Sequence, residues 1–164
     1  MLSGLHDMQP LQIELSIAKY TTATHKIIYT AEASSNLGRF DGIRYGHRTE
    51  NAADWKELYK NTRQEGFEFD TKKEMLAGTF FLSVENKKEY YDKAQQVRTV
   101  IKKEVSKVFE NVDILIVPVE EKYNCLANLT GRPTLTISEG YTLIGKHFDE
   151  ETLINVALDI GGAK

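Results

Sequence analysis

The chain has 164 residues, of which 41% are hydrophobic and 27% charged. These values are typical of one globular domain and exclude a disordered chain. The net charge of −3 gives no overall electrostatic basis for binding nucleic acid or an anionic membrane. No stretch approaches the roughly 18 apolar residues of a membrane span, and the start lacks a signal-peptide pattern. The single cysteine, Cys125, cannot form an internal disulfide, so we expect a reducing, cytoplasmic location.

The first third of the chain predicts a strand, a helix and a loop. Apolar and polar residues alternate over 11–17, which indicates a half-buried strand. Apolar residues recur at helical spacing over 20–37, which predicts a helix. Residues 38–48 contain three glycines and no regular period, which favours a loop.

Three further helices are predicted before the last third of the chain. The first covers residues 51–62, with Asn51 as its cap, and the sequence from 64 to 67 breaks its pattern. The second covers 70–83 and begins at Asp70 or Thr71. The third covers 86–110 and has one apolar stripe along its length. The stripe consists of Tyr90, Ala94, Val97, Ile101, Val105 and Val108.

The last third predicts a small sheet and a final helix. Residues 112–118 are almost wholly apolar, which suits a strand buried on both faces. Residues 123–129 fit one or two helical turns. Residues 133–138 and 141–144 read as two strands, and 148–158 as a helix. We therefore expect one α/β domain over residues 1–164, with a small mixed sheet flanked by helices and Cys125 in its core.

A long stretch resembles a known family. Residues 32–48, EASSNLGRFDGIRYGHR, are similar to the pattern E-A-S-S-N-L-A-R-Y/F-D-G-x-R-Y/F-G of the A subunits of tRNA-dependent (Asp-tRNA(Asn)/Glu-tRNA(Gln)) amidotransferases, within the amidase-signature family. Further matches follow in family order. They are Glu57–Tyr59, Thr62–Phe67, Leu76–Phe80, Tyr90–Thr99, Ala127–Pro133 and Leu143–Glu150.

The resemblance implies the C-terminal part of a truncated amidase-signature fold. The family's catalytic lysine and two serines lie upstream, in a Gly/Ser-rich segment that this sequence does not contain. Ser34 and Ser35, with Lys26 nearby, could stand in for these residues, but we interpret them as structural. We therefore expect no catalytic residue and no amidase activity.

The resemblance also implies that glutamine binding is lost. The family's K-R-R-I corresponds to Lys72–Met75, and a lysine cannot reproduce the two-pronged grip of arginine on a carboxylate. Two further family segments look deleted, one after Pro118 and one near Gly140. The four histidines lack the spacing of a helical metal site, so we expect neither a metal nor a cofactor.

One loop combines basic and aromatic residues and is the candidate interaction site. Such residues can stack on bases and pair with phosphates, as RNA-binding surfaces do. The alternative is an inherited loop that locks the fold, with Arg39 and Asp41 paired. The candidate residues are Arg39, Phe40, Arg44, Tyr45, His47 and Arg48.

These observations predict a protein that binds rather than catalyses, and they leave its partner open. One hypothesis is a phage- or mobile-element-borne inhibitor of a host nucleoprotein, such as an anti-CRISPR-like protein. A second is a component or regulator of tRNA-dependent amidotransferase, which docks on the B subunit or contacts tRNA. A third is half of a split amidase, with the catalytic triad on a separate chain. No membrane partner is expected.

Overall fold

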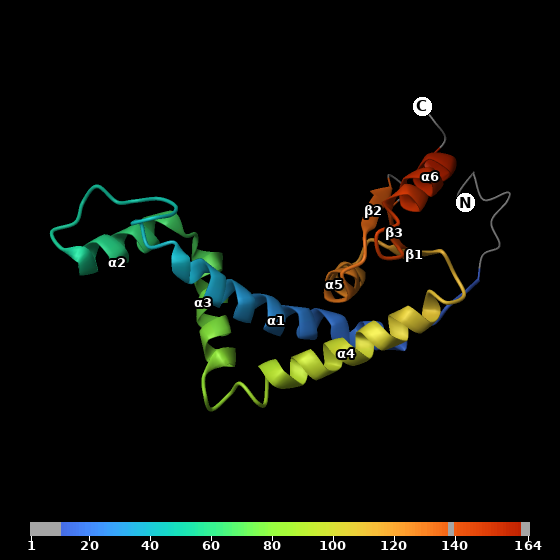
Figure 1. Cartoon of the computed structure of the whole chain (residues 1–164), viewed down its shortest axis with the longest axis horizontal. Coiled ribbons are helices and arrows are strands. Elements are labelled where there is room, and N and C mark those ends of the chain that lie inside the picture. Colours follow the sequence, from blue (N-terminus) through green and yellow to red (C-terminus); the bar gives the residue numbers. More distant parts are fainter. Residues whose placement is uncertain (1–10, 138–139, 162–164) are drawn as a thin grey trace. The chain divides into compact units, whose positions relative to one another are not determined.

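A computed structural model describes residues 11–137 and 140–161 (Figure 1). The chain divides into two compact units. Unit 1 contains residues 1–25 and 96–164, and unit 2 contains residues 26–95. The expected α/β class is confirmed, with helices and a small sheet in the described part of the chain. No described helix is long and apolar enough to cross a membrane.

The sheet of unit 1 has three antiparallel strands in the order β1-β3-β2. They are β1 (Ile114–Pro118), β2 (Thr134–Ile137) and β3 (Tyr141–Gly145). Helix α6 (Glu150–Gly161) packs on the face that carries Leu143, which forms a buried cluster with Leu153 and Ile160. The two strands predicted over 133–144 and the final helix are therefore confirmed.

The other face of the sheet is also covered. Leu115, Val117 and Ile144 are all buried there. Helix α5 (Glu121–Thr130) buries half of its ten residues, including Cys125, as expected for a small core residue. Gly131 ends α5 with a positive φ of 71°, a conformation that suits glycine at a helix C-terminus.

Two helices pass from one unit to the other. Helix α1 (Thr21–Asn36) confirms the helix predicted over 20–37. Helix α4 (Tyr91–Val108) starts five residues later than predicted, because residues 84–90 form turns. Its predicted apolar stripe is correct, since Ala94, Ile101 and Val105 are buried.

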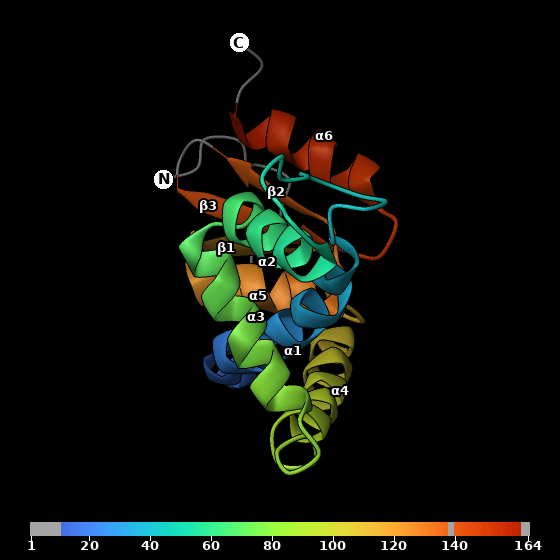
Figure 2. The ribbon, with the colours of Figure 1, turned by 90° about the vertical axis from the view of Figure 1, so that its left-hand side faces the viewer.

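Unit 2 is built from the end of α1, a 3₁₀ turn (Leu37–Arg39), and helices α2 (Trp55–Gly66) and α3 (Phe69–Leu82). Figure 2 shows α2 leading into α3. Helix α3 crosses α1 at Gly78, where a Cβ atom would lie 1.9 Å from the Thr30 carbonyl oxygen and 2.6 Å from the Ser34 Cβ. Only glycine permits so close a crossing.

The strand predicted over residues 11–17 is wrong. Residues 11–15 have no regular structure, and Ser16–Tyr20 form a 3₁₀ helix. Alternation makes a strand only where a neighbouring backbone supplies hydrogen-bond partners. Here no described strand pairs with the segment, and Leu11 is 64% exposed.

The predicted start of α2 is also wrong. Asp54, not Asn51, caps the helix, because its Oδ1 accepts a 2.8 Å hydrogen bond from the Glu57 amide. Glu57 in turn accepts a 3.0 Å bond from the Ala53 amide, so the two acids form a reciprocal cap. The helix continues to Gly66, past the predicted break at 64.

Two other boundary and burial predictions need correction. Helix α3 begins at Phe69, so Asp70 lies inside its first turn and does not cap it. Strand β1 is an edge strand, with alternating burial, rather than a strand buried on both faces. Its Ile116 is 37% exposed.

Candidate functional site

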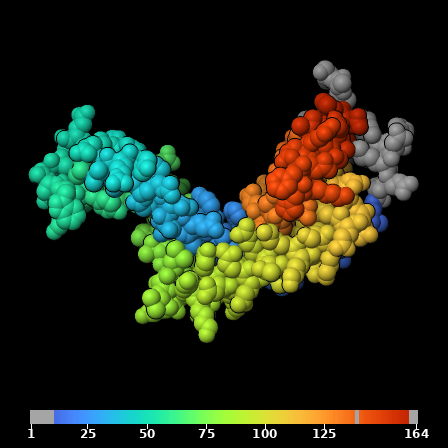
Figure 3. All heavy atoms as spheres, viewed as in Figure 1, coloured from blue at the N-terminus to red at the C-terminus, as the bar shows by residue number. Residues whose placement is uncertain are grey.

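The candidate interaction residues lie in one segment of unit 2, here called the anchored loop (residues 37–54). It runs from the end of α1 to the start of α2, and Figure 3 shows its atoms in cyan at the surface. Of the six candidate residues, only Phe40 is half-buried, and the other five are exposed.

Arg63 of α2 holds the first part of the anchored loop. Its Nη1 donates hydrogen bonds to the carbonyl oxygens of Leu37 at 3.0 Å and Phe40 at 3.1 Å. Its guanidinium also lies 5.0 Å from the ring centroid of Phe67, and that ring meets Phe40 edge to face at 6.4 Å. One cation on a helix therefore satisfies the Phe40 carbonyl oxygen and adds a second donor to the Leu37 carbonyl oxygen, which also accepts a 3.3 Å bond from the Phe40 amide.

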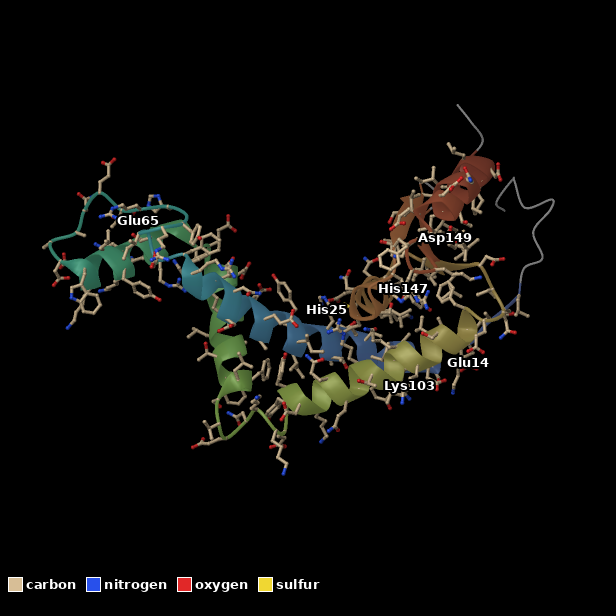
Figure 4. All side chains as sticks on the ribbon, in the orientation of Figure 1. Glu14, His25, Glu65, Lys103, His147 and Asp149 are labelled. Atoms are coloured by element: carbon tan, nitrogen blue, oxygen red, sulfur yellow. The ribbon has the colours of Figure 1, made fainter. Side chains whose placement is uncertain are left out.

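Thr62 and Glu65 of the same helix hold the second part. The Thr62 hydroxyl accepts a 3.1 Å hydrogen bond from the Thr49 amide. The two carboxylate oxygens of Glu65, labelled in Figure 4, contact the Thr49 hydroxyl at 2.8 Å and the His47 Nε2 at 2.7 Å. The hydrogen bond from His47, followed by that from Thr49, lowers the pKa of Glu65 below its usual range.

Contacts inside the anchored loop complete its shape. Asp41 Oδ1 accepts hydrogen bonds from the amides of Ile43 at 2.8 Å and Arg44 at 3.4 Å. The bond from Ile43 is the main reason that the pKa of Asp41 is lowered. The expected Arg39–Asp41 pair is therefore wrong, because the carboxylate of Asp41 bonds to the backbone instead. Arg48 Nη1 donates to the Gly42 carbonyl oxygen at 3.1 Å.

The six candidate residues thus divide into two groups. Phe40, His47 and Arg48 make contacts that fix the loop. The side chains of Arg39, Arg44 and Tyr45 project at the surface. Residues 37–66 contain six Lys or Arg and five Asp or Glu, so the loop and its supporting helix are nearly neutral. Locking the fold accounts for the first group, and only the second remains as a surface for a partner.

A shallow hollow of about 660 Å³ lies where the anchored loop meets α2. Trp55 and Leu58 supply its apolar wall, and residues 48–50 and 52–54 supply the rest. Trp55 is 71% exposed, with the Lys56 ammonium 5.6 Å from its ring centroid. Among the described residues, no group of three or more His, Cys, Asp or Glu is placed to hold a metal ion.

Helix α3 presents an apolar stripe that the sequence pattern did not identify as a surface. Phe69, Leu76 and Phe80 are 74%, 72% and 50% exposed. At 100° per residue, all three lie about 160–200° around the helix from Gly78, which faces α1. The side of the helix away from its crossing with α1 therefore carries these three apolar residues together with Lys73, whose ammonium lies 5.0 Å from the Phe69 ring centroid. We call these three residues the α3 stripe.

Comparison with known proteins identifies the family of this chain. A family model described as Amidase matches residues 2–136. The chain belongs to the amidase family. It is 40% identical to the A subunits of the glutamyl-tRNA(Gln) amidotransferases of Geobacillus sp. (strain WCH70) and Shouchella clausii, and 41% identical to that of Macrococcus caseolyticus.

The alignments cover most of this chain but only a minor part of each amidase-family relative. Each of the three alignments takes in 89% of this chain and 36% of the relative, so the chain spans about a third of their length. The alignments have 174 positions, whereas 89% of 164 residues is about 146. Roughly 28 positions of the relatives, the difference of those two numbers, therefore have no counterpart within the matched part of this chain. That difference agrees with the predicted internal deletions.

Ser34 of α1, the stand-in nucleophile weighed from the sequence, is held in a structural contact. The Ser34 hydroxyl lies 2.9 Å from that of Thr79, which donates to the Met75 carbonyl oxygen. Lys26 is two helical turns away from Ser34, about 12 Å along the axis. A lysine at that distance is not within hydrogen-bond reach of the serine, so the pair lacks the geometry of a nucleophile and its base.

The segment in place of the family's K-R-R-I is also engaged within unit 2. Lys72 Nζ donates to the Gln64 carbonyl oxygen at 2.7 Å, and Lys73 pairs with Asp70 at 2.6 Å. Glu74 accepts a 3.2 Å hydrogen bond from the Tyr29 hydroxyl. The contacts of Lys72 and Glu74 connect α3 to α2 and α1, whereas the Lys73–Asp70 pair lies within α3.

Arg132 is a site residue that sequence reasoning missed. It is only 9% exposed, and its guanidinium lies 3.9 Å from the Phe109 ring centroid. Nη1 donates to the Gly145 carbonyl oxygen at 3.3 Å, while Nε has no hydrogen-bond partner. Burial lowers the pKa of Arg132.

Proposed function

We propose that this chain is a non-catalytic interaction protein of the amidase family, whose partner is a component of tRNA-dependent amidotransferase. The α3 stripe carries the proposal. A line of exposed apolar side chains on one helix is typical of a protein–protein interface. The partner class follows from the identity of about 40% to the A subunits of amidotransferases over 89% of the chain.

The shape of the α3 stripe supports docking by a partner. The three side chains follow one line along the helix, with spacings of seven and four residues. Phe80 is further fixed by ring contacts at 5.7 Å to both Phe81 and Tyr90. A rigid line of two aromatic rings and a leucine can fill an apolar groove with little loss of side-chain entropy.

The direct test is binding of the purified chain to the purified B subunit of the host amidotransferase, measured by interferometry. We expect Leu76→Asp to weaken binding at least about 30-fold, because it buries a charge at the centre of the stripe. The matched control is Leu11→Asp, since Leu11 is 64% exposed and belongs to unit 1. No binding by the unmodified chain, or equal binding by both variants, contradicts the proposal.

Lack of catalysis is tested separately. The purified chain is incubated with glutamine, and ammonia release is measured against a Ser34→Ala variant. We expect no release above background from either protein, because the Ser34 hydroxyl is paired with that of Thr79 and Lys26 lies about 12 Å away along α1. Glutamine-dependent release that disappears in the variant would show that the chain is an enzyme.

A nucleoprotein partner is the second candidate. The exposed side chains of Arg39, Arg44 and Tyr45 support it, because arginines beside an aromatic ring are typical of RNA-binding surfaces. Its origin from a phage or mobile element, and an inhibitory role, stay predictions. A triple Arg39→Ala, Arg44→Ala, Tyr45→Ala variant that loses a nuclease–RNA complex from affinity capture, yet keeps the B subunit, would favour this candidate.

A further inference from the structure

The free edge of β1 can be read from the hydrogen bonds around the sheet. The Val119 amide donates to the Gly140 carbonyl oxygen at 3.0 Å, in register with the β1–β3 pairing. In an antiparallel pair, every second residue bonds to the partner strand and the residues between them point away. Residues 115, 117 and 119 therefore bond to β3. The N–H and C=O groups of Ile114 and Ile116, and the C=O of Pro118, point to the free edge.

This edge is apolar and carries no charge along its length. The strand reads Ile-Leu-Ile-Val-Pro, and Ile116 is 37% exposed at its centre. No backbone hydrogen bond between described residues involves the Ile114 or Ile116 amide outside the β1–β3 ladder. Pro118 has no N–H, and proline in a sheet belongs where its nitrogen faces an open edge.

The opposite edge, on β2, is different. The Gly145 amide donates to the Pro133 carbonyl oxygen at 3.0 Å, in register with the β2–β3 pairing. By the same alternation, Thr134 and Thr136 direct their backbone groups outward. Both are exposed and polar, and the Thr136 hydroxyl lies 3.2 Å from that of Thr142. Only the β1 edge combines open backbone groups with apolar side chains, the condition that favours strand addition.

We propose that the β1 edge pairs with the β1 edge of a second copy of this chain, so that two three-stranded sheets become one. The copies are related by a twofold axis at Ile116. Each Ile116 amide then donates to the Ile116 carbonyl oxygen of the other copy. Each Ile114 amide donates to the other copy's Pro118 carbonyl oxygen, so the missing proline N–H leaves no outward N–H unsatisfied.

Charge and side-chain contacts also fit this pairing. In this register Asp113 lies opposite Val119 of the other copy, and Glu120 lies opposite Val112, so no acid faces an acid. The two Ile116 side chains meet across the axis and cover each other, which removes the main exposed apolar group of the strand from water. Because β1 belongs to unit 1, pairing through its edge does not depend on the α3 stripe of unit 2.

Sedimentation velocity of the purified full chain tests the pairing over a roughly hundredfold range of concentration. We expect the mass to rise from that of the 18.7 kDa monomer toward twice that value. Ile116→Lys places two like charges opposite each other and should raise the dimer dissociation constant at least about tenfold. Ile116→Pro removes the outward N–H while leaving the bonds to β3, and should have a similar effect.

The matched controls are Thr136→Lys and Thr136→Pro on the other edge. They should change the dissociation constant by less than about twofold. Circular dichroism establishes that each variant is folded. A monomeric unmodified chain, or a dimer that survives both Ile116 variants, would overturn the proposal. So would loss of the dimer in the Thr136 variants, because the self-association would then use the β2 edge.

Discussion

The interiors of unit 1 and unit 2 are packed with different kinds of side chain. Unit 1 buries large aliphatic side chains between a sheet and its helices, whereas unit 2, apart from Ile28, buries small residues and threonines. Unit 2 instead directs many of its large apolar side chains outward. The fully buried large aliphatic residues of unit 1 are Ile101, Leu126, Leu143, Ile144 and Ile160. The buried residues of unit 2 are Ile28, Thr30, Ala31, Gly42, Thr49, Thr62, Gly78 and Ala94.

This difference in buried residues indicates which interactions stabilise each unit. Unit 1 is stabilised by a core of aliphatic side chains that its own elements already cover. Unit 2 depends on a close helix crossing and on side-chain hydrogen bonds to a loop. Its apolar residues can contribute fully only when something covers them, so a binding partner should stabilise unit 2 more than unit 1.

Truncating one leucine in each unit should give the largest difference in the free energy of unfolding. Leu143 is completely buried in unit 1, so Leu143→Ala should lower the free energy of unfolding by about 3–4 kcal/mol. Leu76 is 72% exposed in unit 2, so Leu76→Ala should change it by less than about 0.5 kcal/mol. Urea denaturation followed by circular dichroism measures both. Similar losses would mean that the units do not differ as described.

Enlarging the helix crossing should have the next largest effect. Gly78→Ala places a Cβ 1.9 Å from the Thr30 carbonyl oxygen, and the helices must move apart, at a cost of about 2–3 kcal/mol. Gly38→Ala is the control, because its Cβ would meet no atom within 4 Å. Hydrogen exchange should show faster opening of α1 and α3 in the first variant only. Equal protection in the two variants would contradict the crossing.

Removing the arginine that holds the anchored loop comes third. Arg63→Met deletes the bonds to the Leu37 and Phe40 carbonyl oxygens and should cost about 2 kcal/mol. Limited proteolysis should then cut within residues 37–54 at a higher rate. Arg44→Met removes an exposed arginine of the same loop and serves as the control. If both variants are cut equally fast, Arg63 is not the anchor.

Acid should release the second anchor of the loop, with the smallest effect. The pKa of Glu65 is lower in the folded protein than its ordinary value of 4.5. Ionised Glu65 therefore stabilises the fold above pH 4.5, and this contribution is lost as the pH falls through the folded pKa. Amide exchange of Thr49, whose hydroxyl bonds to Glu65, should quicken over that window. A Glu65→Gln variant should show no such step.

The elements most accurately predicted from the sequence are those defined by local pattern. Helices α1 and α3 and strands β2 and β3 end within about one or two residues of their predicted bounds, because their periodicity and flanking residues agree. The strand predicted over 11–17 failed because its alternation finds no described backbone to pair with. Strand β1 was placed correctly, but its position at a sheet edge depends on topology, which a single apolar run does not encode.

The candidate site was located in the sequence, but its internal contacts were not. The loop of arginines and aromatic residues was identified from composition. Its anchors, Arg63, Thr62 and Glu65, lie in a helix that begins later in the chain, and nothing in their spacing distinguishes them from ordinary surface residues. The α3 stripe was also missed, since an apolar helical pattern predicts burial without specifying which face finds a partner.

Every anchor of the loop comes from nearby in the chain. Arg63 reaches back 26 residues to Leu37, Glu65 reaches 18 residues to His47, and Thr62 reaches 13 residues to Thr49. Such short loops close rapidly and need no distant part of the polypeptide. The anchoring contacts of the loop therefore all lie within the segment from Leu37 to Phe67. This segment should keep its conformation when grafted into an unrelated scaffold.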